Sequence, residues 1–303
     1  MAIERRKFIS SSLAFSVLPF VDIYEKTENI GEIGNNRFKV SLNAYSFNAP
    51  LRNGTTNLHE VIEFCAAQGF DAVDLTGYYF PGYPAVPADE YVYQLKRKAH
   101  QLGVSISGTG IRNEFAQPDK PARAKEVALV KNWIEVAARL GAPVIRIFTG
   151  KSLPEKYSRE AVADWITADI NKCVEHGKRH GIIVAIQNHN DFIKTADQAI
   201  DLIKRVNSEW FGLVLDTGSF VTNEPYSEIA KASPYAVNWQ IKEKLNYNGK
   251  IENMDLLKLF KIIKQSTYRG NLPIETLSAG DPFVIIPPFL KQIKQAMEKV
   301  MKG

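Results

Sequence analysis

The sequence predicts an α/β protein of the (β/α)8, or TIM, barrel class. Five times, a helix-like segment ends at a glycine and a strand-like segment follows, in "AAQGFDAVDLTG", "AHQLGVSISGTG", "AARLGAPVIRIFTG", "GKRHGIIVAIQN" and "YRGNLPIETLS". Glycine suits the left-handed residue that closes a helix, and an apolar, β-branched run suits a buried parallel strand. Three more strand-like segments, "FKVSLNAYSF", "WFGLVLDTG" and "YAVNWQIKEK", bring the expected strands to eight.

Helical periodicity fills the intervals between these strands, as in "LHEVIEFCAAQ", "EYVYQLKRKAHQ" and "AKEVALVKNWIEVAARL". Eight strand and helix units in roughly 260 residues favour a closed barrel over an open doubly wound sheet. An open sheet that binds dinucleotides carries a glycine-rich loop after its first strand, and "LNAYSFNAPLRNG" is no such loop. The sequence therefore argues against dinucleotide binding.

Composition indicates one folded domain over residues 38–303. A chain of 303 residues that is 45% hydrophobic can bury one large core. The net charge of +5 is mild, and Arg5, Arg6 and Lys7 against Glu4 supply +2 of it. Acidic and basic residues are interspersed elsewhere, which argues against a nucleic-acid partner.

The first twenty residues, "MAIERRKFISSSLAFSVLPF", place a basic cluster before a short apolar, serine-rich run. This run is too short to span a bilayer, so we expect no stable membrane insertion. Its "ERRKFIS" core resembles the twin-arginine signal, which predicts export to a bacterial periplasm; the alternative is a disordered basic terminus. Residues 21–37 are expected to form a linker. Cys65 and Cys173 are interpreted as small core residues, with a bridge left open for an exported protein.

Polar residues stand where four of the expected strands end. Gln187 and His189 share strand parity, so both point toward the barrel axis if the strand stays extended. Asp216 ends the sixth strand and Glu275 lies in the eighth. The seventh strand ends with Gln240 and Lys242. A buried charge without a partner costs several kcal/mol, so these residues indicate a functional site at the barrel mouth, where the catalytic residues of such barrels lie.

The order of four motifs, "AIQNHND", "GLVLDTGSF", "VNWQIKE" and "PIETLSAGD", resembles the xylose-isomerase-like (β/α)8 superfamily over about residues 38 to 300. That superfamily contains sugar and sugar-phosphate isomerases and epimerases and the type IV AP endonucleases. The resemblance implies one divalent metal, Mn²⁺, Mg²⁺ or Zn²⁺, held by a glutamate, an aspartate, a histidine and a glutamate on strands five to eight. The corresponding positions here are Gln187, Asp216, Gln240 and Glu275.

Three of the matched positions depart from the superfamily pattern. Gln187 replaces a carboxylate that also moves a proton in the epimerases, Gln240 replaces an imidazole ligand, and Ser219 stands where "LDxxH" members carry a histidine. Amide oxygens ligate hard cations but add no charge. Two alternatives follow: a weakly held Mn²⁺ or Mg²⁺, or a site without metal. The resemblance to AP endonucleases implies a histidine-rich zinc site, whereas the other four histidines fall in helix-like sequence.

Three residues are predicted to carry chemistry. Glu275 is the expected general base next to a sugar carbonyl, Lys242 the group that stabilises the enediolate oxygen, and His189 the proton donor or relay. His189 and Lys242 each have a structural alternative: His189 fixed by neighbouring amides, and Lys242 paired with Glu243.

Further residues at strand ends are expected to shape the substrate pocket: Tyr45 and Phe47 ending strand one, Asp74 and Tyr78 after strand two, Arg112, Asn113 and Glu114 after strand three, Arg146 in strand four, and Asn188, Ser219 and Glu243. The inward-pointing Arg146 needs an anionic partner, and the candidates are Asp74, Glu114 and a substrate anion. The aromatic loop "TGYYFPGYP" is expected either to stack on a sugar ring or to pack on itself.

Together these features predict an exported enzyme of the sugar isomerase and epimerase type that removes a proton next to a carbonyl of a carbohydrate. The amide at Gln187 weakens a two-base epimerase and favours a lyase or hydratase of a keto sugar. The alternative class is a sugar-binding protein without catalysis that has lost the metal. Superfamily members often dimerise, so a homodimer is expected from the resemblance alone.

Overall fold

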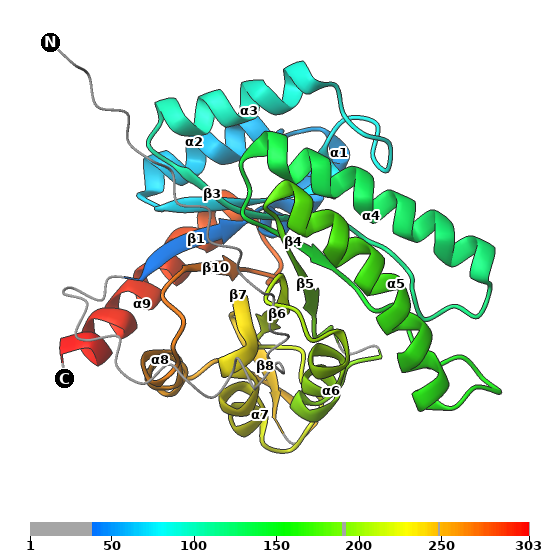
Figure 1. The fold of residues 1–303 in the computed structure, drawn as a ribbon. Helices are drawn as coiled ribbons and strands as arrows, with labels where there is room; N and C mark the ends of the chain where they lie inside the picture. The colour runs from blue at the N-terminus through cyan, green and yellow to red at the C-terminus, as the bar shows by residue number, and fades with distance from the viewer. Residues whose placement is uncertain (1–37, 190–191, 248, 303) are drawn as a thin grey trace, which may run out of the picture. The chain divides into compact units, whose positions relative to one another are not determined.

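The barrel is closed by eight parallel strands in the part of the chain that the structure describes. The computed structural model describes residues 38–189, 192–247 and 249–302. The predicted signal and linker, residues 1–37, lie outside these ranges. The strands are β1 (Lys39–Asn43), β2 (Ala72–Thr76), β3 (Ser105–Gly110), β4 (Val144–Ile147), β5 (Ile183–Gln187), β6 (Phe211–Asp216), β7 (Ala236–Lys242) and β10 (Asn271–Glu275). Their order around the barrel is β1-β10-β7-β6-β5-β4-β3-β2, which confirms the predicted fold (Figure 1).

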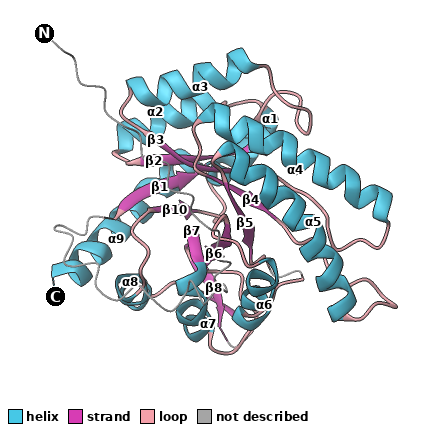
Figure 2. Ribbon diagram, in the orientation of Figure 1, coloured by secondary structure: helices cyan, strands magenta, loops and turns pink. Residues whose placement is uncertain are grey.

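Helices surround these strands, and turns connect them (Figure 2). The α-helices are α1 (Asn48–Asn53), α2 (Leu58–Gln68), α3 (Asp89–Gln101), α4 (Lys120–Leu140), α5 (Arg159–His180), α6 (Ala196–Val206), α7 (Pro225–Ala232), α8 (Leu256–Gln265) and α9 (Pro282–Lys302). Three short 3-10 helices are η1 (Ala44–Phe47), η2 (Gly77–Tyr79) and η3 (Ser233–Tyr235). Among the described residues, no helix is both long and apolar enough to cross a bilayer.

The glycines between helix and strand act as the sequence suggests in most of the repeats. Gly69, Gly141 and Gly181 follow α2, α4 and α5 with φ between 67° and 83°, and their N–H groups bond to the last helical turn. The last repeat differs, because α8 ends at Gln265 before Ser266 and Gly270 lacks a positive φ. A side chain at Gly270 would instead meet the hydroxyl of Tyr268.

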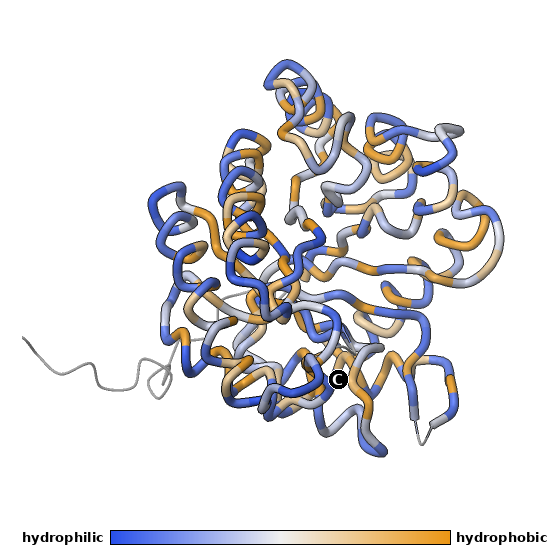
Figure 3. Tube along the Cα trace, turned by 90° about the vertical axis from the view of Figure 1, so that its right-hand side faces the viewer, coloured by the Kyte–Doolittle hydropathy of each residue, from blue (hydrophilic) through white to orange (hydrophobic). Residues whose placement is uncertain are grey.

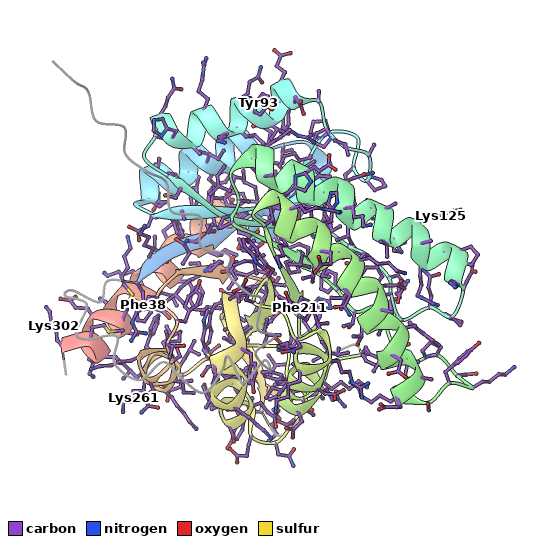
Figure 4. All side chains as sticks on the ribbon, in the orientation of Figure 1. Phe38, Tyr93, Lys125, Phe211, Lys261 and Lys302 are labelled. Carbon is purple, nitrogen blue, oxygen red and sulfur yellow. The ribbon has the colours of Figure 1, made fainter. Side chains whose placement is uncertain are left out.

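Apolar residues divide into two layers. Outward-facing strand residues such as Leu42, Val73 and Ile274 pack under the helices in one large core. Inside the barrel, a small separate cluster contains Val144, Ala185 and Val214. Along the helices in Figure 3, orange and blue stretches alternate, as expected for helices with one buried face. Figure 4 shows Lys125, Lys261 and Lys302 pointing outward from α4, α8 and α9.

The structure corrects two expectations. Strand one ends at Asn43, earlier than predicted, because the Asn43 side chain accepts a hydrogen bond from the Tyr45 N–H and starts η1. An antiparallel hairpin, β8 (Lys244–Tyr247) and β9 (Lys250–Asn253), follows β7 and was not predicted. The Asn-Gly pair of "NYNGK" is the sequence signal that could have indicated this hairpin.

Replacing Trp133 by alanine should cost about 3–5 kcal/mol of unfolding free energy. Its ring is fully buried, its Nε1 donates to the carbonyl of Pro84 at 3.0 Å, and it meets Phe80 and Tyr83 at 5.4 Å between centroids. Urea denaturation measures the change. Tyr93→Ala is the control, because Tyr93 is 49% exposed on α3 and its loss should change stability by under about 0.5 kcal/mol. Equal losses for the two variants would contradict this packing.

Candidate functional site

Gln187, Asp216, Gln240 and Glu275 converge at the carboxyl ends of β5, β6, β7 and β10. Gln187 Nε2 donates to Asp216 Oδ2 at 2.7 Å, and Gln240 Nε2 donates to Glu275 Oε2. All four side chains are buried, with exposed fractions of 5% or less. The four matched positions therefore form one polar centre inside the barrel.

Lys242 joins the two halves of this centre. Its Nζ donates to Glu275 Oε1 and lies 3.5 Å from Asp216 Oδ2. The alternative pairing with Glu243 is not what the structure shows, because Glu243 Oε2 instead accepts the N–H groups of Leu277 and Ser278. Successive strand residues point to opposite faces, which separates Lys242 from Glu243.

Burial and charge set the protonation of the Lys242–Glu275 pair. Burial by itself lowers the pKa of Lys242, but the carboxylates of Asp216 and Glu275 outweigh it and raise that pKa, so the amine is an ammonium ion. Burial raises the pKa of Glu275, and Lys242 opposes this rise. Their contact has the geometry of an ion pair and is held out of water.

Backbone contacts fix these side chains in place. The Asn188 amide pairs with both the N–H and the carbonyl of Asp216, at 2.9 and 2.8 Å. Asp216 Oδ1 accepts the N–H of Gly218 at 3.0 Å, and Thr217 Oγ1 accepts the N–H of Lys242 at 3.0 Å. A Cβ at Gly218 would lie 2.8 Å from Cγ of Lys242, so only glycine leaves room for the lysine stem. Sequence reasoning missed Thr217 and Gly218, and it assigned Asn188 to substrate.

The polar centre does not fit the divalent metal that the superfamily resemblance implies. A carboxylate can only accept hydrogen bonds, so both glutamines present N–H groups to Asp216 and Glu275 and turn no lone pair toward them. The Lys242 ammonium lies against both carboxylates. A divalent cation would have to displace this ammonium and compete with two N–H donors.

Among the described residues, one group of three metal-ligating side chains comes together elsewhere. Glu135 on α4 and His176 and His180 on α5 place their ligand atoms within 4.8 Å of one another. His59 and His100 also lie on helices, α2 and α3. The prediction that these histidines lie in helices, away from the strand ends, is confirmed, and this outer group is separate from the four matched positions.

Arg146 lies on another side of the barrel interior. Its Nη1 donates to the Tyr78 hydroxyl at 2.6 Å and to the carbonyl of Ile111, and its guanidinium lies 4.3 Å from the Phe148 ring centre. The described residues give Arg146 no ion pair with either expected partner. The carboxylate of Glu114 instead accepts the N–H groups of Ala116 and Lys151.

Asp74 is a buried carboxylate within β2, whereas the sequence analysis placed it after that strand. It is 6% exposed, and no hydrogen bond or ion pair links its carboxylate to another described residue. Burial raises its pKa to about 6, with Arg146 opposing and Glu275 adding to the rise. A Cβ at Gly108 would lie 2.6 Å from Asp74 Oδ2, so glycine there makes room for the carboxylate.

His189 lines two cavities. One, of about 300 Å³, also borders Ser219, Lys242, Glu243 and the hairpin residue Ile251. The other, of about 520 Å³, also borders Arg112, Asn113, Glu114 and Phe148. The imidazole meets the Phe148 ring at 4.8 Å between centroids. Partial desolvation lowers the pKa of His189 although Asp216 opposes it, so the neutral imidazole dominates near pH 7.

Several expected pocket residues have structural contacts instead. Phe47 is fully buried and packs against Phe64 and Phe283 in the outer core. The Asn113 amide pairs with both backbone groups of Phe148. The aromatic loop packs largely on itself, on Trp133 and on α3, through Tyr78, Tyr79, Phe80 and Tyr83. Tyr45, half-buried, meets Tyr78 edge to face at 6.4 Å.

Asp74→Asn should stabilise the protein at pH 7 but not at acid pH. The folded-state pKa of about 6 lies above the ordinary 3.8, so the parent loses stability as pH rises from about 4 to about 6. The gain on substitution should reach about 3 kcal/mol at pH 7 and fall toward zero near pH 4. Urea unfolding at several pH values measures it. Asp119→Asn, which removes an exposed carboxylate before α4, is measured in parallel as the surface control. A pH-independent effect of Asp74→Asn would contradict the expectation.

Comparisons with known proteins agree with the architecture. An L-ribulose 3-epimerase superposes with a TM-score of 0.72 at 16% identity, covering 88% of this chain and 96% of that one. A D-psicose 3-epimerase from Clostridium cellulolyticum H10, with D-tagatose, gives 0.68 at 15% identity, covering 88% and 97%. A 3-keto-D-glucoside 4-epimerase from E. coli gives 0.67 at 12% identity, covering 88% and 100%.

Identities this low establish a shared fold alone. A search of curated protein sequences finds no significant match. A family model described as the xylose isomerase-like TIM barrel matches residues 62–302, which is most of the chain. This protein therefore belongs to the xylose isomerase-like TIM barrel family.

Proposed function

We propose that the protein is an enzyme of the sugar isomerase and epimerase type that removes a proton next to a carbonyl group of a carbohydrate. One observation carries the proposal: a buried ammonium and carboxylate pair, Lys242 and Glu275, at the carboxyl ends of the barrel strands. Barrels of this class place their catalytic groups at these strand ends. The cavity that Lys242 and His189 line gives a small molecule access to the lysine side of the pair.

The roles follow from charge and position. Glu275, whose pKa is raised by burial, accepts the proton as the C–H bond breaks. The electron pair of that bond moves through the carbon skeleton to the carbonyl oxygen and forms an enediolate. The Lys242 ammonium stabilises the new negative charge. Return of the proton to the former carbonyl carbon, with the hydroxyl proton of the neighbouring carbon moving to the former carbonyl oxygen, completes an isomerisation. Delivery of a proton to the opposite face of the original carbon completes an epimerisation.

A carbohydrate is the proposed substrate class. The structural neighbours include proteins named as psicose, ribulose and 3-keto-glucoside epimerases, whose names all specify a sugar. The two cavities that meet at His189 are lined by both polar and apolar groups, including Ser219, Arg112 and Phe148. Such mixed linings suit the hydroxyl groups and the apolar face of a sugar ring.

A lyase acting on a keto sugar is a second candidate, because His189 borders both cavities. A glycoside with a carbonyl could place its two parts in the two cavities. After Glu275 takes the proton, the C–O bond to the leaving group breaks and the electron pair goes to that oxygen. The imidazolium form of His189, which is the minor form near pH 7, supplies the proton to that oxygen. This reaction needs one base, which agrees with an amide at Gln187.

The sugar-binding alternative without catalysis has less support. It rested on neutral amides that could bind sugar hydroxyls. The N–H groups of Gln187 and Gln240 are directed at Asp216 and Glu275, and the Asn188 amide at the Asp216 backbone. These amides organise the charged centre, and a charged pair beside a cavity suits proton transfer.

Hydrogen–deuterium exchange tests the proposal without knowledge of the product. The protein in D₂O is incubated with D-psicose, L-ribulose and a 3-keto-D-glucoside, and proton NMR follows loss of the signal next to the carbonyl. Glu275→Gln should slow exchange about 10²- to 10⁴-fold because the amide cannot accept the proton. Glu298→Gln, at an exposed carboxylate on α9, should leave it unchanged. Absence of exchange with every sugar by the parent would contradict the proposal for these classes.

The lyase candidate predicts a dependence on the leaving group. His189→Gln should slow release of the leaving group from a 3-keto glycoside by about 10²-fold or more when that group is an unactivated alcohol, since the glycosidic oxygen then needs a proton to depart. Release of 4-nitrophenolate, which departs without one, should change little. Liberated product is measured by chromatography. An equal effect on both glycosides would rule out His189 as the proton donor.

A further inference from the structure

We propose that the Lys242 ammonium takes the place of the divalent cation implied by the family resemblance, so that this member needs no metal at its polar centre. The inference concerns the site of the proposed function and rests on it only for the consequence in catalysis. The metal content and the cation selectivity of the protein test it without any activity assay.

The strand order explains how a lysine reaches the centre. β7 lies between β10 and β6 in the barrel, so a side chain near the end of β7 rises between Glu275 and Asp216. Lys242 is paired in register with Glu275, and Gln240 with Asp216. The Lys242 Nζ contacts a carboxylate oxygen on each side. A cation bound by those two carboxylates would compete for the same oxygens.

The two glutamines complement the lysine. At their positions the family resemblance implies a carboxylate and an imidazole, which both offer lone pairs to a cation. Here Gln187 gives an N–H to Asp216 and Gln240 gives one to Glu275. Each carboxylate therefore receives one amide hydrogen bond and one ammonium contact. Gln187, Gln240 and Lys242 are thus consistent with one arrangement, in which the lysine side chain supplies the positive charge between the two carboxylates.

The charge balance favours the same conclusion. The Lys242 Nζ contacts the carboxylates of both Asp216 and Glu275, so two acidic side chains share one basic side chain. Buried charges are stable only when they are paired. Adding a divalent cation to this nearly balanced and buried set would leave excess positive charge, whereas removal of Lys242 would leave two unpaired carboxylates.

For the proposed reaction, the Lys242 ammonium would stabilise the oxyanion less strongly than a divalent cation does, but it is a permanent part of the protein. An ammonium ion carries one charge and hydrogen-bond donors, and it places both beside the developing oxyanion. The side chain cannot be removed by a chelator. Any proton-transfer activity of the protein should therefore persist in EDTA.

The first experiment measures metal in the parent protein. The chain is produced in medium supplemented with Mn²⁺ and Zn²⁺, dialysed against metal-free buffer and analysed by inductively coupled plasma mass spectrometry. We expect less than about one tenth of a metal ion per chain. A ligand that binds the folded state raises the melting temperature. Because we expect no Mn²⁺ to bind, the melting temperature should be the same in EDTA and in millimolar Mn²⁺. One tightly held ion per chain that remains in a His176→Ala variant, which removes the outer group on α4 and α5, would overturn the proposal if EDTA also lowers the melting temperature of that variant.

The second experiment removes the ammonium. Lys242→Met keeps the length of the side chain and frees the two carboxylates, so Mn²⁺ should bind at least tenfold more tightly than to the parent, as measured by calorimetry. Lys261→Met is the matched control, because Lys261 points outward from α8 (Figure 4) and its loss should leave Mn²⁺ binding unchanged. Circular dichroism establishes that each variant is folded.

A third variant covers the case in which Lys242→Met does not fold. The combination Gln187→Glu, Gln240→His and Lys242→Met restores the ligand types that the resemblance implies and should bind about one Mn²⁺ per chain. If folded variants without Lys242 bind Mn²⁺ no better than the parent, the lysine is not what excludes the cation and the proposal fails. If only the proposed function is wrong, the metal measurements will still give the expected results. The error will show only in the exchange assay, as an absence of proton exchange with the sugars.

Discussion

The contact of the Lys242 ammonium with Asp216 and Glu275 is the interaction on which the site depends. These three charged groups are buried, with exposed fractions of 8%, 0% and 3%. Taking them out of water is unfavourable by several kcal/mol each unless they compensate one another. Neighbouring residues hold the three groups in this geometry. Thr217 fixes the backbone of Lys242, and Asn188 fixes that of Asp216. Gln240 bonds the second carboxylate oxygen of Glu275, and Gln187 bonds the Asp216 oxygen that faces Lys242.

Barrel closure supplies the geometry of this contact. Asp216, Lys242 and Glu275 come from three adjacent parallel strands whose registers align Asp216 with Gln240 and Lys242 with Glu275. In an open sheet the first and last strands would be edges, but here β1 pairs with both β10 and β2. The ring is therefore complete, and the interior below the site is filled by small apolar residues such as Val144 and Val214.

The fold and the convergence of the site could be predicted from the sequence, because both follow from periodicity. Alternation along a strand puts Gln240 and Lys242 on one face, and strand order puts their ends beside Asp216 and Glu275. Contacts set by three-dimensional packing could not be predicted. Phe47 resembles a pocket residue in sequence, but η1 turns it into the outer core. Arg146 resembles half of an ion pair, but it bonds to Tyr78 and a backbone carbonyl instead.

The substitutions at the polar centre are best understood as a coupled set. A glutamate at position 187 alone would place a third carboxylate beside Asp216, with only Lys242 nearby to compensate it. A histidine at position 240 alone would lose the amide N–H that Glu275 now accepts. Residues within one buried network are not additive, so either single change should destabilise the network while Lys242 remains. The amides and the lysine therefore constrain one another: loss of Lys242 frees the two carboxylates for a cation, but the full set of ligand types implied by the resemblance returns only if all three positions change.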